Sequence, residues 1–214
     1  MQKLRIFSFL LLFLAPFALS AQVHETPESL IHAGKHRYGI ESGSVKYEFR
    51  GKASGFELIR FDNYGWQEVR RTEKVTSTFG MTNSQKVLSI LRGNRQAFHN
   101  LGSQYASVSN ERFLTGALSE SSPAMEVLFG EEVIKRKKAK MVGTEVILGQ
   151  RCKVYEVAYE NSKVWVWEGI VLKSVQKILD EEVVMEATQL DLDWEPTPAA
   201  FALPEGLTVQ GMEW

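Results

Sequence analysis

The sequence predicts an α+β fold that is mainly β: a strongly curved antiparallel sheet, or incomplete barrel, with helices on its concave side. Polar and apolar residues alternate along residues 44–51, and similar short segments recur to residue 194. Turn residues separate these segments. A change to helical spacing between residues 111 and 140 predicts the helices. Because twist accumulates from strand to strand, we expect so wide a sheet to curl.

The first strands form a predicted meander. In "SVKYEFRG", Val45, Tyr47 and Phe49 share one face and alternate with charged residues. Small residues at 53–55 turn the chain into residues 56–65, and residues 66–79 follow. Residues 86–101 are predicted to form a hairpin around Gly93–Asn94, because both residues tolerate a positive φ.

Helical character is strongest in the middle of the chain. Ser122 is a suitable N-cap and Pro123 suits a first turn, while Leu128 and Phe129 begin an apolar pattern of helical spacing. The segment ends in "KRKKAK", where cations favour the negative end of a helix dipole. A second, short helix is predicted to start at Thr26–Pro27.

Strands then resume and complete one domain. Short loops are predicted at residues 149–150, 161–162, 169 and 180–181, so each strand can reach its neighbour. The C-terminal "PTPAAFALPEGLTV" contains three prolines and reads as irregular. The predicted strands are residues 144–149, 151–160, 163–169, 170–179 and 182–194.

The first 21 residues read as a cleaved signal peptide. Lys3 and Arg5 precede an apolar run over residues 6–15, which is too short to cross a bilayer as a helix. Small residues then predict cleavage after Ala21, with cleavage after Ser20 or an uncleaved anchor as the alternatives. We therefore expect a periplasmic or secreted domain, residues 22–214, with no transmembrane segment after processing.

Charge and cysteine content narrow the function classes. The chain has 25 basic and 26 acidic residues, and removal of Lys3 and Arg5 gives the mature domain a net charge of −3. This balance argues against nucleic acid as a partner. The single cysteine, Cys152, cannot form an internal disulfide and reads as a packing residue in a strand, with a reactive thiol as the alternative.

Three stretches together resemble a known family. They are "YGIESGSVKYEFRGKASGFELIRFDNYG", "MVGTEVILGQRCKVYEV" continuing into "KVWVWEGIVLKS", and "ATQLDLDWEPTPAAFALPEGLTV". Over roughly residues 37–210 the chain resembles the outer-membrane lipoprotein-sorting superfamily, the LolA/LolB-like envelope proteins, and more closely a secreted branch of it. The resemblance implies an incomplete β-barrel whose open mouth is capped by helices. It also implies an apolar hollow that takes acyl chains, although fold alone does not establish function.

Six apolar or aromatic residues are the candidate ligand-binding residues. Trp165 and Trp167 alternate in one strand and therefore point the same way. Tryptophan packs apolar chains while its N–H seeks a polar partner. Ordinary core filling is the alternative for each residue. The candidates are Tyr47, Phe49, Leu128, Phe129, Trp165 and Trp167.

The leading hypothesis is therefore a binding protein that shelters a lipid or a lipoprotein acyl chain and performs no chemistry. No catalytic residue, metal site or cofactor is expected, because the common nucleophile, phosphate-binding and metal motifs are missing from the sequence. The alternative is a structural or protein-interaction module of the cell envelope with a filled core. A hydrolase with an unrecognised site is the third hypothesis.

Three weaker patterns each have a simpler explanation. His32 and His36 lie one helical turn apart, as in half of a zinc site, but a solvated helix end explains them as well. Asp191 and Asp193 alternate like a carboxylate pair and read as an exposed polar face. "KRKKAK" matches a site for anionic lipid head groups, and a helix end also accounts for it.

Overall fold

The described residues form one twelve-stranded sheet. The computed structural model describes residues 36–78, 81–93, 95–110, 138–178 and 181–214. The strands run in the spatial order β12-β6-β5-β4-β3-β2-β1-β11-β10-β9-β8-β7. Their bounds are β1 (Gly43–Gly51), β2 (Ala53–Asp62), β3 (Gln67–Thr78), β4 (Met81–Arg92), β5 (Arg95–Asn100), β6 (Tyr105–Asn110), β7 (Lys140–Ile147), β8 (Gln150–Val157), β9 (Ser162–Trp167), β10 (Ile170–Ile178), β11 (Glu181–Asp191) and β12 (Thr208–Gly211).

The sheet consists of two meanders joined through β1. On one side β1 to β6 follow each other in chain order, and on the other side β7 to β11 do the same, with β11 returning beside β1. These neighbours are antiparallel, whereas the short β12 pairs with β6 in parallel. The meander predicted over residues 44–79 is confirmed for its described residues, although β2 already begins at Ala53, where a turn was expected. The hairpin at residues 93–94 is confirmed as well, since Arg92 pairs with Arg95.

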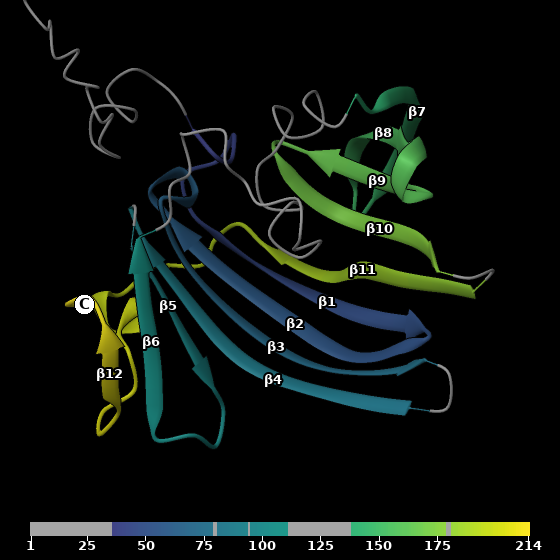
Figure 1. Ribbon diagram of the computed structural model, residues 1–214. Helices are drawn as coiled ribbons and strands as arrows, with labels where there is room; N and C mark the ends of the chain where they lie inside the picture. The colour runs from purple at the N-terminus through teal and green to yellow at the C-terminus, as the bar shows by residue number, and fades with distance from the viewer. Residues whose placement is uncertain (1–35, 79–80, 94, 111–137, 179–180) are drawn as a thin grey trace, which may run out of the picture.

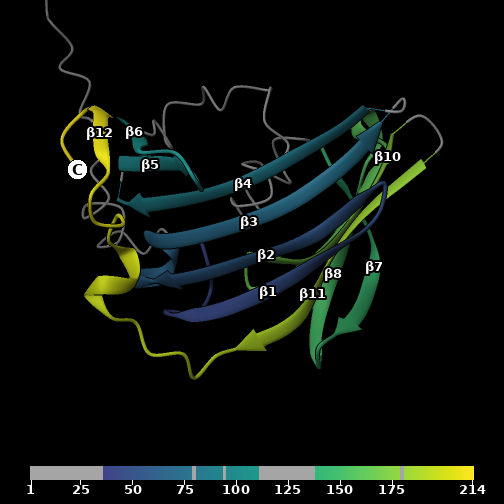
Figure 2. The ribbon, with the colours of Figure 1, turned by 90° about the horizontal axis from the view of Figure 1, so that it is seen from below.

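Strong curvature brings the two halves of the sheet toward each other. Figures 1 and 2 show β1 to β4 as long bent strands, with β8 to β10 lying across from them. We call the side that carries Tyr47 and Ile59 the concave face. One contiguous core cluster includes these residues together with Val154, Val166 and Leu172 of the other half. The main apolar core of the described residues therefore extends over both halves of the sheet.

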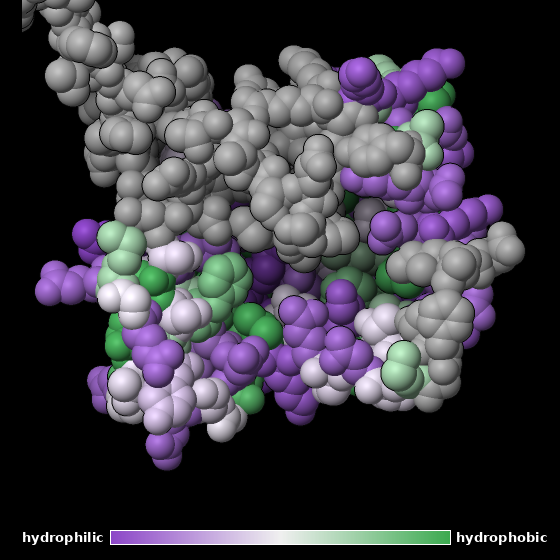
Figure 3. Space-filling model, viewed as in Figure 1, coloured by the Kyte–Doolittle hydropathy of each residue, from purple (hydrophilic) through white to green (hydrophobic). Residues whose placement is uncertain are grey.

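A second, smaller core lies on the opposite face of the β4–β6 end. Ile90, Ala97 and Val108 point away from the concave face there and pack against Phe201. Phe201 belongs to the 3₁₀ turn η3 (Pro198–Phe201), whose first residue is the proline that suits such a turn. Apolar side chains remain exposed at the neighbouring β6–β12 edge (Figure 3), among them Tyr105 and Val209.

The predicted α+β class with helices on the concave side is wrong. Within the described ranges the chain contains strands and only three short 3₁₀ turns: η1 (Asn63–Gly65), η2 (Ala158–Glu160) and η3. The end of the expected central helix, residues 138–140, is a turn that leads into β7. In the described residues the main core is instead built mainly from side chains of the strands themselves, and η3 packs on the other face.

The remaining predictions on organisation fall outside the described ranges. The signal peptide, the helix starting at Thr26–Pro27 and most of the central helical segment belong to these residues. Among the residues that are described, no helix has the length and apolar character needed to cross a membrane.

Candidate functional site

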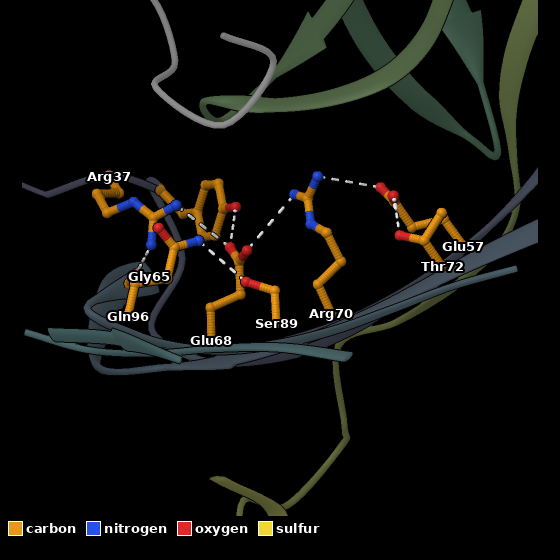
Figure 4. Close-up of polar contacts among 9 residues, drawn as sticks. Arg37, Glu57, Gly65, Glu68, Arg70, Thr72, Ser89 and Gln96 are labelled. Atoms are coloured by element: carbon orange, nitrogen blue, oxygen red, sulfur yellow. Dashed lines mark hydrogen bonds and ion pairs between the residues drawn. The ribbon is translucent and has the colours of Figure 1, made fainter. Parts of the chain in front are cut away.

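Four charged side chains are buried together on the concave face of the sheet. Glu57 on β2 and Glu68 and Arg70 on β3 have exposed fractions of 4–8%, and Arg37 from the segment before β1 is equally buried. We call Arg37, Glu57, Glu68 and Arg70 the ionic cluster. Figure 4 shows Glu57, Glu68 and Arg70 rising from the same side of the sheet, with Arg37 reaching Glu68 from the segment before β1.

Strand alternation explains why these charges share a face with the core. Glu57 alternates with Ile59 and Phe61, which are both buried, so it points to the same side as they do. The ladder register continues this face across to β3, because Glu57 pairs with Thr72 and Ile59 pairs with Arg70. The polar positions of β3 therefore face inward.

Ion pairs and hydrogen bonds connect the cluster. Arg70 lies between two carboxylates, with Nη1 3.2 Å from Glu57 Oε1 and Nη2 3.4 Å from Glu68 Oε1. Arg37 Nη2 lies 3.3 Å from Glu68 Oε2. Two hydroxyl groups add donors: Tyr38 donates to Glu68 Oε2 at 2.6 Å, and Thr72 donates to Glu57 Oε2 at 2.8 Å. The two formal positive charges thus match the two formal negative charges.

Burial and charge together fix the protonation of the groups around Arg70. Burial lowers the pKa of Arg70, but the neighbouring carboxylates of Glu57 and Glu68 outweigh it and hold that pKa above its ordinary value. Burial raises the pKa of Tyr38 and of Tyr47, and the Glu68 carboxylate raises both further. Arg70 therefore stays a cation and both phenols stay neutral throughout the physiological pH range.

A short strap positions Arg37 and Tyr38. The backbone N–H groups of both residues donate to Tyr64 O, and the side chain of Arg37 donates to Gly65 O. Gly39 N–H donates to Glu168 O at 2.8 Å in the turn between β9 and β10. Residues 37–39 thus connect a turn of one half of the sheet to a turn of the other half.

Arg70 keeps donor capacity that the described part of the chain does not use. Among the polar atoms that the structure describes, Arg70 Nε and Nη2 are buried and make no hydrogen bond, although Nη2 lies near Glu68. Gln96 Oε1 is likewise buried without a donor, while Gln96 Nε2 donates to Ser89 Oγ at 2.9 Å. Ser89 pairs with Arg70 in the ladder. Buried polar groups without partners are rare because each costs free energy, so this site is incomplete by itself.

Two of the predicted ligand-binding residues lie next to this site. Tyr47 is buried in the main core cluster, close enough to Arg70 for the arginine charge to act on its phenol. Phe49, two positions along β1, shares that face and is partly buried. Lys74 Nζ lies 5.3 Å from the centre of the Phe49 ring. Leu128 and Phe129 lie outside the described residues.

The two tryptophans lie on the other face. Phe49 pairs with Met185, Met185 with Ser174, and Ser174 with Val164. Trp165 follows Val164 directly and therefore points to the opposite side of the sheet, as does Trp167. The structure thus separates the predicted set into two groups, although all four described members belong to or pack against the main core cluster.

Trp165 has a specific polar partner. Its indole Nε1–H donates to Glu145 Oε2 at 2.6 Å, and Lys173 Nζ lies 5.3 Å from the centre of its ring. Trp165 itself is buried, with an exposed fraction of 8%. These contacts satisfy both the apolar body and the polar tip of the side chain.

The weaker sequence candidates have local structural roles. Cys152 is buried, and burial raises its thiol pKa. His36 stacks on the Tyr64 ring at 3.7 Å between centroids, while His32 lies outside the described residues. Asp191 ends β11 and accepts a hydrogen bond from Asp193 N–H. No three His, Cys, Asp or Glu side chains among the described residues lie together as metal ligands would.

Sequence reasoning missed the ionic cluster because its pattern looks like an exposed face. Glu68, Arg70 and Thr72 alternate with apolar or charged residues, as they would on a solvated strand. One signal was present: Glu57 interrupts the apolar face formed by Ile59 and Phe61. A charge on the apolar face of a strand indicates either a buried partner or a site.

Comparison with known proteins yields structural neighbours but no family. No family model and no curated protein matches the chain. MucB in the MucA/MucB complex of Pseudomonas aeruginosa is 13% identical at a TM-score of 0.40, with 80% of this chain and 58% of that chain covered. LprF from Mycobacterium bovis is 8% identical at 0.37, with 80% and 94% covered. The Mycobacterium tuberculosis lipoprotein LppX is 11% identical at 0.29, with 74% and 89% covered.

These likenesses are too distant to assign a function. The chain spans little more than half the length of the MucB chain that it matches. None of these three proteins is named LolA or LolB, so the family predicted from the sequence stays a prediction.

Proposed function

We propose that this chain is an exported, non-catalytic carrier that holds an apolar ligand, a lipid or an acyl chain, against the concave face of its sheet. One observation carries the proposal: the concave face combines apolar side chains with buried polar groups that have no hydrogen-bond partner among the described residues. An apolar ligand with a polar end would fit both. Its release would consist of transfer to another protein of the envelope.

Burial of the ligand's apolar surface would supply the binding free energy. Transfer from water contributes about 25 cal/mol per Å², or about 0.8 kcal/mol per methylene. A carrier needs no more than this, because no bond is made or broken. Accordingly, no residue of the site is assigned a catalytic role.

A pair of phenylalanines on opposite faces provides the test. Phe49 lies on the concave face, and Phe56 lies on the neighbouring strand with the opposite orientation; both are partly buried. The affinity of a fluorescent fatty-acid methyl ester, used as the probe, would be measured for Phe49→Ser and, as the matched control, for Phe56→Ser. We expect the first substitution to weaken binding about tenfold and the second to have little effect.

Absence of saturable probe binding to the wild-type protein would contradict the carrier function, and so would equal losses in the two variants. Native mass spectrometry of the purified protein gives an independent readout. It should detect a co-purifying lipid that denaturation releases.

A protein-interaction module is the second candidate, and the edge strand β7 favours it. Every residue of β7 except Ile147 is exposed, including the apolar Met141, Val142 and Val146. Its outer edge has no neighbouring strand in the described sheet. An exposed apolar edge can pair with an extended peptide through backbone hydrogen bonds.

This candidate makes a separate prediction. Extended peptides selected against the wild-type protein should bind Phe49→Ser normally and lose binding to Val146→Lys. Peptides that bind both variants equally would exclude the β7 edge as the interaction site.

A further inference from the structure

The unused donors of Arg70 indicate which kind of ligand end the concave face accepts. Arg70 is about nine-tenths buried, and its guanidinium points away from the sheet toward the other half (Figure 4). Its Nη1 forms an ion pair with Glu57, and its Nη2 lies near Glu68. Nε and Nη2 nevertheless donate no hydrogen bond within the described structure. A ligand atom that accepts hydrogen bonds would satisfy them.

The charge balance of the cluster decides between an anionic and a neutral acceptor. Arg37 and Arg70 are already matched by Glu57 and Glu68, so an added carboxylate or phosphate would leave a net negative charge at a buried site. It would also lie beside two existing carboxylates. Burial of an uncompensated charge is costly, whereas a neutral carbonyl oxygen gains the same N–H donors without this cost.

An unused acceptor on the same face of the sheet adds a second requirement. Gln96 Oε1 has no donor among the described residues, and Gln96 binds Ser89, the ladder partner of Arg70. A hydroxyl group next to the ligand carbonyl would donate to this oxygen. The chemistry that satisfies both groups is a carbonyl that carries a neighbouring hydroxyl.

From this geometry we infer that Arg70 binds the polar end of the ligand, and that this end is an uncharged ester or amide carbonyl with an adjacent hydroxyl, as in a monoacylglycerol, rather than a free carboxylate or a phosphate. The inference rests on the proposed carrier function, because it specifies the ligand of the same site. Hydrogen bonds from a charged donor to a neutral acceptor in a dry site are strong enough to discriminate between ligands.

The experiment compares three ten-carbon ligands on the full chain. Decanoate, methyl decanoate and monodecanoylglycerol would each compete with the fluorescent probe at pH 7.5, below their aggregation concentrations. We expect monodecanoylglycerol to bind most tightly, and methyl decanoate to bind about tenfold more tightly than decanoate. Decanoate that binds as tightly as the methyl ester would overturn the inference and leave the carrier function standing. If no ligand displaces the probe and the probe itself does not bind, the carrier function fails instead.

Two variants assign the effect to the named atoms. Arg70→Lys keeps the charge and removes Nε and the planar fork, so the affinity for methyl decanoate should fall about tenfold. Arg60→Lys, at an exposed position on the other face, is the matched control and should retain the wild-type affinity. An unchanged affinity for methyl decanoate in Arg70→Lys would overturn the assignment to Arg70.

Gln96→Met tests the acceptor independently, even if Arg70→Lys fails to fold. It should weaken monodecanoylglycerol about tenfold and leave methyl decanoate, which has no hydroxyl, unaffected. Equal effects on both esters would contradict the hydroxyl site.

Discussion

The guanidinium of Arg70 lies 3.2 Å from the carboxylate of Glu57, although the two side chains are only 10% and 6% exposed. Removal of one partner from a buried pair leaves an uncompensated charge, which typically costs about 3–5 kcal/mol. We therefore expect Arg70→Gln to lower the free energy of unfolding by about this amount. Denaturant unfolding followed by circular dichroism measures it.

The matched control for this prediction is an exposed ion pair of the same sheet. Lys52 and Glu181 lie 2.7 Å apart with side chains 39% and 50% exposed. Lys52→Gln should change the free energy of unfolding by less than about 1 kcal/mol. Similar losses in the two variants would show that the ionic cluster is solvated in solution.

Because Tyr47 is buried, we expect the protein to lose stability at high pH. Its pKa is raised in the folded state above the unfolded value of about 10. The contribution to stability is therefore complete below pH 10 and declines as pH rises from 10 toward the folded pKa. Above pH 10 we expect a decline of about 1.4 kcal/mol per pH unit from this group.

In Tyr47→Phe the free energy of unfolding should fall less steeply with pH between pH 10 and 11.5, by about 1.4 kcal/mol per pH unit. Tyr105→Phe, which removes a phenol that is 52% exposed, is the control for the loss of a hydroxyl group. A Tyr47→Phe slope equal to that of the wild type would mean that this phenol ionises in the folded protein.

The surroundings of Gly169 indicate that the strap, residues 37–39, is tightly packed against it. Its φ is +76°, and an added Cβ would lie 2.6 Å from Arg37 O. Gly149, with a φ of +78°, has open space around it. Both alanine variants incur the cost of a positive φ, typically about 1 kcal/mol, but only Gly169→Ala must also displace the strap.

We expect the melting temperature of Gly169→Ala to fall clearly below that of Gly149→Ala. The variant should also weaken probe binding, because the strap carries Arg37 and Tyr38 to the ionic cluster. Equal melting temperatures would show that residues 37–39 can move away without cost.

Cys152 is expected to be inert in the folded protein. It is buried in the main core, and its raised thiol pKa reduces the fraction of reactive thiolate. Its reaction with an aromatic disulfide reagent at pH 8 should therefore be slow and should accelerate to the rate of a free thiol in denaturant. Rapid reaction under native conditions would contradict the packing of β8.

Local patterns were sufficient to predict many of the strands. The alternation around Val45 and Tyr47 correctly identified the buried face of β1, because a strand with one buried face has to repeat apolar residues with a period of two. The pair Gly93–Asn94 identified the β4–β5 hairpin for an equally local reason. The central helical pattern was misleading for residues 138–140, since β7 begins there in contact with β8.

Long-range pairing determined the rest. Nothing in either strand alone specifies that β11 lies beside β1 or that β12 lies beside β6, because any strand edge offers the same backbone groups. Strand alternation places the side chains of Trp165 and Trp167 on the same face of the sheet. Only the ladder across β11, β10 and β9 shows that they face away from Phe49.

The sequence by itself determined where many of the strands lie and which of their residues alternate, because these properties depend on neighbours within a few positions. It also determined that Glu57 interrupts an apolar face. It did not identify β12, which begins in the segment that reads as irregular. Only the tertiary structure decided that Glu68 and Arg70 are buried, since a polar strand face reads the same whether water or the other half of the sheet covers it. Burial, and with it the ionic cluster, is a property of curvature rather than of any single strand.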